Sequence, residues 1–413
     1  MRQSIMTTRS RRWFLRLGAA WSAALVACRS KTAPPGAEPR ALGASVSAYG
    51  SRSRFNRAAR LVNTNTRVPL EEAASFTPLR DTYGIITPSS LHFERHHAGV
   101  PEIDPATHTL TIHGLVDRPL AFTVDDLKRL PSVSRIHFLE CSGNSLSEWR
   151  RPGESARSDV QRIHGLTSCS EWTGVPVSLL LRECSVDPKA TWVLAEGADA
   201  CKMTRSIPMK KMLDDALAVY AQNGEPLRPE QGYPLRLLLP GWEGNSNVKW
   251  LRRLKAMDQP AMSREETSKY TDLMPDGTAR QFTFDMEAKS IITRPSGGDT
   301  LAGPGLYEIT GIAWSGRGTI ARVEITIDGG ATWTPAELQT PVLPRAHTRF
   351  RWRWQWDGRD ALIASRCTDD TGYTQPPLAD LIAIRGRNSM YHNNGIQMWK
   401  VAADGTITNG NRA

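Results

Sequence analysis

Short apolar segments set the hydrophobic pattern in the first half of the chain. Residues 107–114, "THTLTIHG", alternate between apolar and polar positions, and residues 234–241, "PLRLLLPG", form a continuous apolar run that ends at Pro-Gly. Both patterns are typical of β-strands. Residues 122–131, "FTVDDLKRLP", have the acidic first turn of a helix that starts after Thr123, and residues 177–184, "VSLLLREC", also indicate a helix. Because no regular βαβ repeat or GxGxxG motif occurs, we expect an α+β fold without a dinucleotide-binding domain.

After about residue 281 the pattern changes to short alternating strands separated by Gly and Asp turns. Examples are "GLYEITGIAWSG", "ARVEITIDGGATW" and "ALIASRCTDDTG". This spacing predicts a β-sandwich over residues 281–413. In residues 349–356, "RFRWRWQW", the arginines share one face of the strand and the aromatic residues share the other. The arginine face is either solvated or part of an interface, and the pattern leaves both readings open.

The first 28 residues have the pattern of an export signal. They contain five arginines and no acid, and the apolar segment at residues 17–27 is too short for a transmembrane helix of about 20 residues. Arg11 and Arg12, followed by Trp-Phe-Leu, are similar to the core of a twin-arginine signal, which predicts export of the folded protein to the periplasm. Cys28 is either the lipid-anchored residue of a lipobox or lies at an ordinary cleavage site. Residues 29–70 lack periodicity, so we expect a flexible linker there.

Charge and cysteine spacing exclude two classes of partner and cofactor. The formal net charge is +10 and falls to +5 when the five arginines of residues 1–28 are removed, and no Lys/Arg tract or nucleic-acid motif occurs. We therefore expect no nucleic-acid partner, and contact with a membrane only through a lipid at Cys28. The six cysteines show no CxxCH spacing, so we expect no c-type haem in this chain.

Cys141 lies in an unusual context. It ends the apolar run of "HFLECSGNSLSEW", residues 137–149, and directly precedes a Ser-Gly-Asn turn. No second cysteine lies near it in the sequence. Taken alone, Cys141 is either a buried structural cysteine or a thiolate ligand, placed where Gly143 lets another group approach the backbone closely.

Five segments together resemble one known family. They are "LHFERHHAGVP", "FLECSGN", "AEGAD", "GYPLRLLLPGWEGNSNVKW" and the region of Tyr270, and their order and approximate spacing are those of the sulfite oxidase family of molybdenum enzymes. The resemblance runs from about Phe76 to the C-terminus. It implies a molybdopterin-binding domain over residues 71–280 and an immunoglobulin-like dimerisation domain over residues 281–413. Within the family, the details are similar to the molybdoprotein subunit of sulfane dehydrogenases that act in thiosulfate oxidation.

The resemblance also implies a Mo-molybdopterin cofactor and assigns residues to it. Cys141 would be the one protein ligand of the metal, because a soft thiolate suits molybdenum already held by dithiolene sulfurs. Arg95 and Tyr270 would complete the catalytic pocket, with the tyrosine hydroxyl toward the metal. The implied cofactor contacts are Phe93, Arg95, His96, His97, Cys141, Asp199, Gln231, Arg236, Asn247 and Lys249. Arg236 and Lys249 would hold the terminal phosphate, which needs fixed cationic donors.

Several of these assignments have an alternative. His96 and His97 are adjacent and could be surface residues or ligands of a separate metal, and Tyr270 could belong to a loop packed between domains. Gln231 stands where sulfite oxidases carry a histidine, and Asn247 also differs in type from the family residue. Disulfide pairing in the mature chain is left open for Cys169, Cys184, Cys201 and Cys367.

Two departures from sulfite oxidases bear on the substrate. The family arginine five residues after the ligand cysteine is replaced here by Leu146, and residues 150–171 contain no tryptophan, although the family has one in its pocket. A site without that cation and that wall favours the sulfane sulfur of a cysteine persulfide on a carrier protein. Electrons would pass to a separate c-type cytochrome, in a homodimer or in a heterotetramer with the cytochrome. The alternatives are a sulfite dehydrogenase and, from another class, a non-catalytic scaffold or binding subunit.

Overall fold

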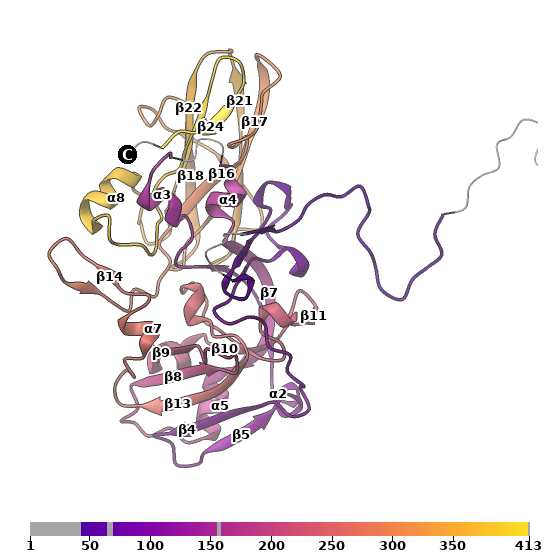
Figure 1. Ribbon diagram of the computed structural model, residues 1–413, viewed down its shortest axis with the longest axis vertical. Coiled ribbons are helices and arrows are strands. Elements are labelled where there is room, and N and C mark those ends of the chain that lie inside the picture. The colour runs from indigo at the N-terminus through magenta and orange to yellow at the C-terminus, as the bar shows by residue number, and fades with distance from the viewer. Residues whose placement is uncertain (1–42, 64–68, 155–157, 412–413) are drawn as a thin grey trace, which may run out of the picture. The chain divides into compact units, whose positions relative to one another are not determined.

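The computed structural model describes residues 43–63, 69–154 and 158–411 (Figure 1). The predicted twin-arginine signal and Cys28 lie outside the described residues. The chain divides into two parts, residues 1–57 and residues 58–413, and residues 43–57 contain no helix or strand. Every element named below belongs to the second part. None of the helices in the described ranges is long and apolar enough to cross a membrane.

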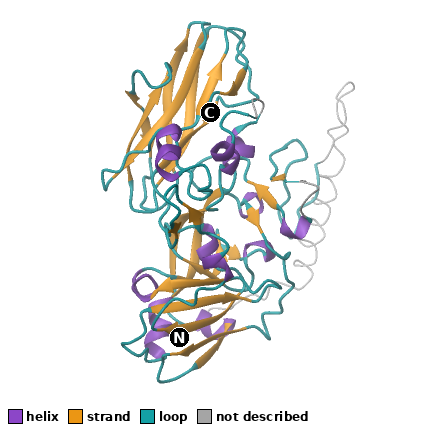
Figure 2. Ribbon diagram, turned by 60° about the vertical axis from the view of Figure 1, so that its left-hand side comes forward, coloured by secondary structure: helices purple, strands orange, loops and turns teal. Residues whose placement is uncertain are grey.

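Two five-stranded sheets form the framework of the first half (Figure 2). One sheet consists of β6 (Val133–Glu140), β7 (Thr167–Pro176), β10 (Leu217–Gln222), β11 (Glu225–Pro226) and β12 (Arg236–Leu238). The other sheet consists of β4 (Thr109–Gly114), β5 (Leu120–Thr123), β8 (Trp192–Gly197), β9 (Thr204–Pro208) and β13 (Leu251–Met257). Their orders are β11-β10-β7-β6, with β12 also paired to β10, and β5-β4-β13-β8-β9. Among the strand pairs of these two sheets, within the described residues, β4 and β13 form the one parallel pair.

Short helices, a three-stranded sheet and a hairpin complete this half. The α-helices are α2 (Val124–Arg129), α3 (Leu146–Arg150), α4 (Val160–His164), α5 (Val177–Glu183), α6 (Met209–Asp214) and α7 (Arg264–Thr267). The 3-10 turns are η1 (Leu70–Glu72), η2 (Leu79–Asp81), η3 (Ser89–Leu91), η4 (Pro229–Gln231) and η5 (Gly244–Ser246). The small sheet contains β1 (Leu61–Val62), β2 (Ala74–Phe76) and β3 (Glu94–Arg95), and the hairpin contains β14 (Asp272–Leu273) and β15 (Ala279–Arg280).

A capping box explains why α2 starts where the sequence predicted. The Thr123 hydroxyl accepts a hydrogen bond from the backbone N–H of Asp126, and the Asp126 carboxylate accepts one from the backbone N–H of Thr123. Two donors of the first turn are thereby satisfied. The strand predicted over residues 234–241 is shorter than expected, because only Arg236–Leu238 pair with β10 before the chain turns.

The second half is the predicted β-sandwich, so the α+β fold class is confirmed. One sheet has the order β16 (Lys289–Arg294), β17 (Gly305–Trp314), β21 (Thr348–Trp356) and β20 (Glu337–Gln339). The other has the order β19 (Thr334–Pro335), β18 (Ile320–Thr326), β22 (Ala361–Asp369), β23 (Met398–Val401) and β24 (Ile407–Asn409). A helix that the sequence did not predict, α8 (Leu378–Arg385), follows β22.

Strand β21 has the two faces that its alternating sequence predicts. Phe350, Trp354 and Trp356 are buried in the sandwich core, whereas Arg351 and Arg353 are exposed. Arg351 pairs with the exposed Glu337 of β20, so part of the arginine face is solvated. The alternative role of this face in an interface stays a prediction.

One apolar core joins the two halves. Phe138 of β6 and Ile163 of α4 belong to the same buried cluster as Ile291 of β16 and Trp314 of β17. Each of these side chains is at most 2% exposed. Because protein cores pack densely, the end of β6 is packed into the same core as the sandwich.

One sequence expectation needs correction, and one question that the sequence left open is answered for the described residues. The predicted linker of residues 29–70 contains β1, which pairs in antiparallel register with β2, Leu61 opposite Phe76, and η1 begins at Leu70. Composition could not reveal this, because the strand exists only through pairing with a later segment. The five cysteines in the described ranges all carry free thiols, so no disulfide joins those that were left open.

Candidate active site and cofactor cavity

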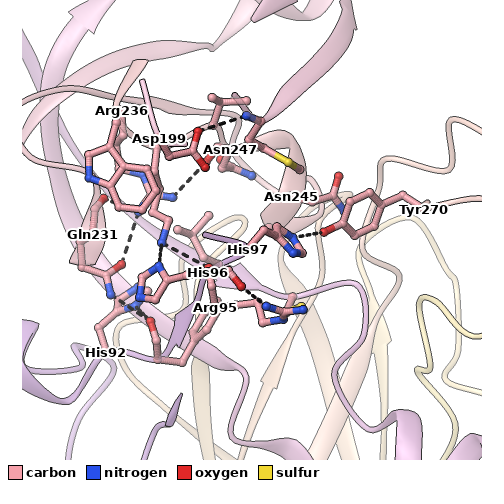
Figure 3. A pocket seen from close by; sticks show the side chains of 18 residues that line it. His92, Arg95, His96, His97, Asp199, Gln231, Arg236, Asn245, Asn247 and Tyr270 are labelled. Carbon is pink, nitrogen blue, oxygen red and sulfur yellow. Dashed lines mark hydrogen bonds between the residues drawn. The ribbon is translucent and has the colours of Figure 1, made fainter. Parts of the chain in front are cut away.

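One cavity brings together every residue that the sequence assigned to the site (Figure 3). The assigned residues on its walls are Phe93, Arg95, His96, His97, Cys141, Asp199, Gln231, Arg236, Asn247, Lys249 and Tyr270. The sequence reasoning missed seven further wall residues, His92, Leu139, Met203, Gly244, Asn245, Val248 and Trp250. Three of them directly adjoin an assigned residue in the chain, and that adjacency was a signal that could have found them. We call this space the inner cavity.

The inner cavity lies at the ends of strands from both sheets of the first half. Cys141 directly follows β6, and Arg236 is the first residue of β12 in the same sheet. Asp199 lies just after β8, and Lys249 lies just before β13, in the other sheet. Strand ends hold side chains rigidly while leaving them open on one side, so this placement suits a site with fixed geometry.

Arg236 and Lys249 form a buried cationic end of the cavity. No carboxylate within the described residues forms an ion pair with either side chain. Arg236 donates to the backbone carbonyls of Gln231 and Asn247, at 3.0 and 3.3 Å, but its Nε has no hydrogen-bond partner. Burial lowers the pKa of Arg236 to about 9, and burial together with Arg236 lowers the pKa of Lys249 to about 7. An anion bound between them would relieve both penalties, since an opposite charge favours the charged form.

Gly232 allows these two cations to pack close together. It adopts a φ of 106°, and a Cβ at this position would lie 3.1 Å from the Cβ atoms of both Arg236 and Lys249. Any side chain here would therefore be strained and would crowd the cationic end.

Gln231 and Asn247 support Arg236 more than they face the cavity. The Gln231 amide donates to the Phe93 carbonyl at 2.9 Å and offers its oxygen to Arg236 at 3.4 Å. The Asn247 side chain accepts from the backbone of Leu239 at 2.6 Å and donates to backbone carbonyls of its own turn. Both amides thus fix the backbone around the cation, and neither role requires the residue type found in sulfite oxidases.

Asp199 places a carboxylate at another part of the wall. It is buried, accepts from the backbone N–H of Met203 at 3.1 Å, and accepts from the Cys201 thiol at 2.8 Å. A carboxylate has about four acceptor positions, so it can still accept from the amino and ring N–H groups of a pterin.

His97 and Tyr270 are joined by a hydrogen bond of 2.7 Å (Figure 3). Burial lowers the pKa of His97 to about 4 and raises the pKa of Tyr270, so both side chains are neutral at pH 7. The contact orients the tyrosine hydroxyl at the cavity wall. The alternative of Tyr270 as a mere packing residue is disfavoured by this position, although its catalytic role stays a prediction.

His96 is fully engaged with its neighbours. Its Nε2 donates to Glu94 at 2.9 Å, and its Nδ1 accepts from Lys249 at 2.8 Å. Because both ring nitrogens have partners, His96 positions the lysine. No group of three metal-ligating side chains occurs in the described part of the chain, which gives a separate metal site at the two histidines no support.

Cys141 is held by its backbone, with its thiol at the cavity wall. Its N–H donates to the Leu166 carbonyl at 2.9 Å, and its own carbonyl accepts from Asn144 at 2.9 Å. Burial raises the pKa of the Cys141 thiol, against smaller opposing effects of the Gly143 backbone and Arg95. A metal ligand must be the thiolate, so metal binding would release this proton. A Cβ at Gly143 would lie 3.9 Å from the Cys141 sulfur, so the glycine leaves the space beside the sulfur open.

A second, wider space meets the inner cavity at four residues, Arg95, His97, Cys141 and Tyr270, which line both. This outer cavity has a volume of about 950 Å³. Leu146, the first residue of α3, is half-buried in its wall. The outer cavity therefore has both the Cys141 thiol and the apolar side chain of Leu146 in its wall. Leu146 stands at the position where the resemblance implied an arginine in sulfite oxidases.

The outer cavity carries an excess of positive charge. Arg150, Arg162 and Lys269 line it and form no ion pair within the described residues, whereas Arg264 pairs with Glu265. Anionic molecules would be drawn toward such a surface. Met390 and Tyr391 of the second half also line it. Sequence reasoning missed both, because nothing local in the C-terminal segment signals its contact with residues far earlier in the chain.

Comparison with known proteins identifies the family. Residues 97–265 match the oxidoreductase molybdopterin binding domain, and residues 280–399 match the Mo-co oxidoreductase dimerisation domain. The crystal structure of the sulfane dehydrogenase SoxCD from Paracoccus pantotrophus is 46% identical, with a TM-score of 0.87, and the match covers 91% of this chain and 96% of that chain. The chain belongs to the sulfite oxidase family of molybdenum enzymes. The family confirms a molybdopterin-binding half followed by a dimerisation half, and Mo-molybdopterin as the cofactor.

More distant members of the family match a smaller share of their own length. Mitochondrial sulfite oxidase of Mus musculus is 30% identical over 344 residues, which are 77% of this chain and 62% of that protein. The NADH nitrate reductase of Ulva prolifera is 31% identical over 348 residues, 75% of this chain and 40% of that enzyme. The chain thus spans about two fifths of the nitrate reductases that it matches.

The residues of the inner cavity fit the family cofactor. The partner-free Nε of Arg236 suits a phosphate, as do two cations that form no ion pair within the described residues. The carboxylate of Asp199 suits a pterin. The Cys141 thiol at the junction with the outer cavity suits a metal that must also meet a substrate.

Proposed function

We propose that this protein is a periplasmic molybdenum oxidoreductase that oxidises the sulfane sulfur of a cysteine persulfide on a carrier protein. The observation that carries the proposal is the wide outer cavity, about 950 Å³, which meets the inner cavity at Cys141 and has Leu146 in its wall. At position 146 a small dianion meets leucine where sulfite oxidases have an arginine, whereas the wide cavity leaves room for a tethered persulfide. The 46% identity to a sulfane dehydrogenase supports the same substrate.

The side chains at the junction have distinct tasks in this proposal. When bound, the molybdenum cofactor accepts two electrons while a water-derived oxygen is added to the sulfur. Arg95 would hold the anionic persulfide, and Tyr270, kept neutral and oriented by His97, would donate a hydrogen bond to oxygen. The first oxidation would convert R–S–S⁻ and one water into R–S–SO⁻, two protons and two electrons. A separate c-type cytochrome would accept the electrons. This protein would form either a homodimer or a heterotetramer with that cytochrome.

A sulfite dehydrogenase is the second candidate, because Arg95 and the cationic outer wall would also attract sulfite. Turnover of the wild type on free sulfite and on a persulfidated carrier, each with the cytochrome, separates the two functions. Efficient oxidation of sulfite alone would overturn the carrier proposal. A protein without molybdenum, purified from the export-competent host, would instead favour the non-catalytic scaffold.

Leu146→Arg is expected to shift the preference toward sulfite. A guanidinium at this half-buried wall position would restore a charge-assisted contact with a dianion, worth about 1.5–3 kcal/mol. Sulfite turnover at low concentration should rise about tenfold or more, and turnover on the carrier should fall as the cavity narrows. Steady-state kinetics on both substrates measures the shift.

Ser147→Arg serves as the matched control, because it adds the same charge at the next position of the same cavity wall, where the side chain is exposed. An equal rise of sulfite turnover in both variants would show a general charge effect. Unchanged kinetics in Leu146→Arg would remove Leu146 as a determinant of substrate choice.

Arg11→Lys combined with Arg12→Lys is expected to leave the precursor in the cytoplasm, although net charge is unchanged. A twin-arginine route reads the guanidinium pair itself, whereas a general export signal reads positive charge. Cell fractionation measures the result, and Arg9→Lys with Arg16→Lys is the matched control. Normal periplasmic accumulation of the Arg11/Arg12 variant would contradict the proposed route.

A further inference from the structure

A fully buried ion pair lies directly behind Cys141. Glu140, the last residue of β6, and Lys289, the first residue of β16, are each 1% exposed, with 2.9 Å between Oε1 and Nζ. Trp314 of β17 donates its indole N–H to the second carboxylate oxygen of Glu140 at 2.7 Å. The pair therefore joins the strand that carries Cys141 to two strands of the second half.

The same pair closes the loop that follows Cys141. Asn144 donates its amide to Glu140 at 2.9 Å, and Lys289 donates to the Ser145 hydroxyl at 3.1 Å. That hydroxyl also contacts Nδ1 of the buried His164 at 2.6 Å. Burial lowers the pKa of His164 well below its usual value, so the ring is neutral. Its Nε2 donates to the Gln397 amide oxygen at 3.3 Å, and its Nδ1 therefore accepts from the serine.

The loop needs such support because its backbone is not in a favourable conformation. Ser145 has a φ of 66°, in the left-handed region that residues other than glycine rarely adopt. The loop is also tied back through Asn144, whose side-chain oxygen accepts from the Leu166 backbone N–H at 3.2 Å. Leu166 in turn accepts from the backbone N–H of Cys141. Each of these hydrogen bonds has at least one partner within five residues of Cys141.

Stability alone is a poor reason for such a pair. Removing two charges from water costs about as much as a buried pair regains, and apolar replacements of similar volume are often neutral or stabilising. What a satisfied buried network supplies is one defined geometry. The residues fixed here are those between β6 and α3, which place the Cys141 thiol at the junction of the two cavities.

We propose that Glu140 and Lys289 are positioning residues for Cys141, so that the second half of the chain sets the orientation of the metal ligand. The inference rests on the proposed function in one respect, namely that Cys141 binds the metal. Neither residue lines a cavity, so both act through the loop and not by touching substrate.

The test compares Lys289→Met, Glu140→Gln and the double variant with wild type. Three quantities are measured: the alkylation rate of Cys141 in cofactor-free protein, the electron paramagnetic resonance signal of Mo(V) in the loaded enzyme, and kcat and KM. We expect Lys289→Met to alkylate faster, to show altered g-values, and to lose kcat about tenfold or more with KM nearly constant. The double variant should regain thermal stability without regaining the wild-type signal.

Two further variants keep the test decisive. Trp314→Phe removes the indole N–H together with part of a buried ring, keeps both charges, and covers the case in which the charge variants do not fold. It should shift the same quantities in a milder form. Lys211→Met breaks another buried ion pair, with Asp215, outside both cavities, and should lower thermal stability without changing the Cys141 alkylation rate. Wild-type alkylation and g-values in the double variant and in Trp314→Phe would overturn the proposal, whatever the substrate turns out to be.

Discussion

Cys141→Ser is expected to leave the protein folded and to reduce turnover to a background level. A hard hydroxyl with a high pKa replaces a soft thiolate as the metal ligand, and molybdenum held by sulfur strongly prefers the thiolate. The two side chains are nearly equal in size, so packing around the loop changes little. Turnover, molybdenum content and thermal unfolding, measured on the same preparation, test the expectation.

Cys184→Ser is the matched control. It exchanges the same atoms at a buried cysteine in the core of the first half, outside both cavities. It should keep normal turnover with a small loss of stability. If Cys141→Ser retained near-normal turnover with bound metal, Cys141 would not be the ligand, and the reading of the site would fail.

Arg236→Met is expected to give protein that folds but retains little cofactor. Methionine keeps much of the side-chain length and removes the guanidinium N–H donors that Arg236 contributes to the cationic end of the inner cavity. Each lost charge-assisted hydrogen bond to a phosphate costs about 1.5–3 kcal/mol, which corresponds to about 10- to 100-fold weaker retention. Molybdenum and pterin content per protein chain measures the loss.

Arg349→Met is a close control for this variant. Arg349 also donates to backbone carbonyls, those of Thr82 and Gly84, and burial also lowers its pKa, yet it lines neither cavity. It should lose stability and keep its cofactor. A full complement of cofactor in Arg236→Met would mean that the phosphate lies elsewhere.

The residues that could be predicted from the sequence share one property, which is that each lies in a short, recognisable sequence motif. Cys141 directly follows β6, Arg236 begins β12 and Lys249 lies just before β13, and each belongs to a short segment that carries the family resemblance. The capping box at Thr123 is similarly local. Such features can be recognised without knowing which residues pack against them.

What the sequence concealed depends on contacts between distant segments. β1 exists because it pairs with β2, Tyr391 reaches the outer cavity from beyond α8, and Lys289 finds Glu140 across the boundary between the halves. Lys289 alone reads as an ordinary strand-end lysine facing water. Only the fold shows that its ammonium group is buried against a carboxylate.

The contacts around Glu140 also fix an order of events during synthesis. A ribosome delivers Cys141 well before it delivers Lys289 and Trp314, and N-terminal segments generally fold first. Until Lys289 and Trp314 have emerged, Glu140 lacks both of its partners from the second half, and Ser145 lacks its hydrogen bond from Lys289. We therefore expect the loop that carries the metal ligand to reach its final geometry only after residues 289–314 have left the ribosome.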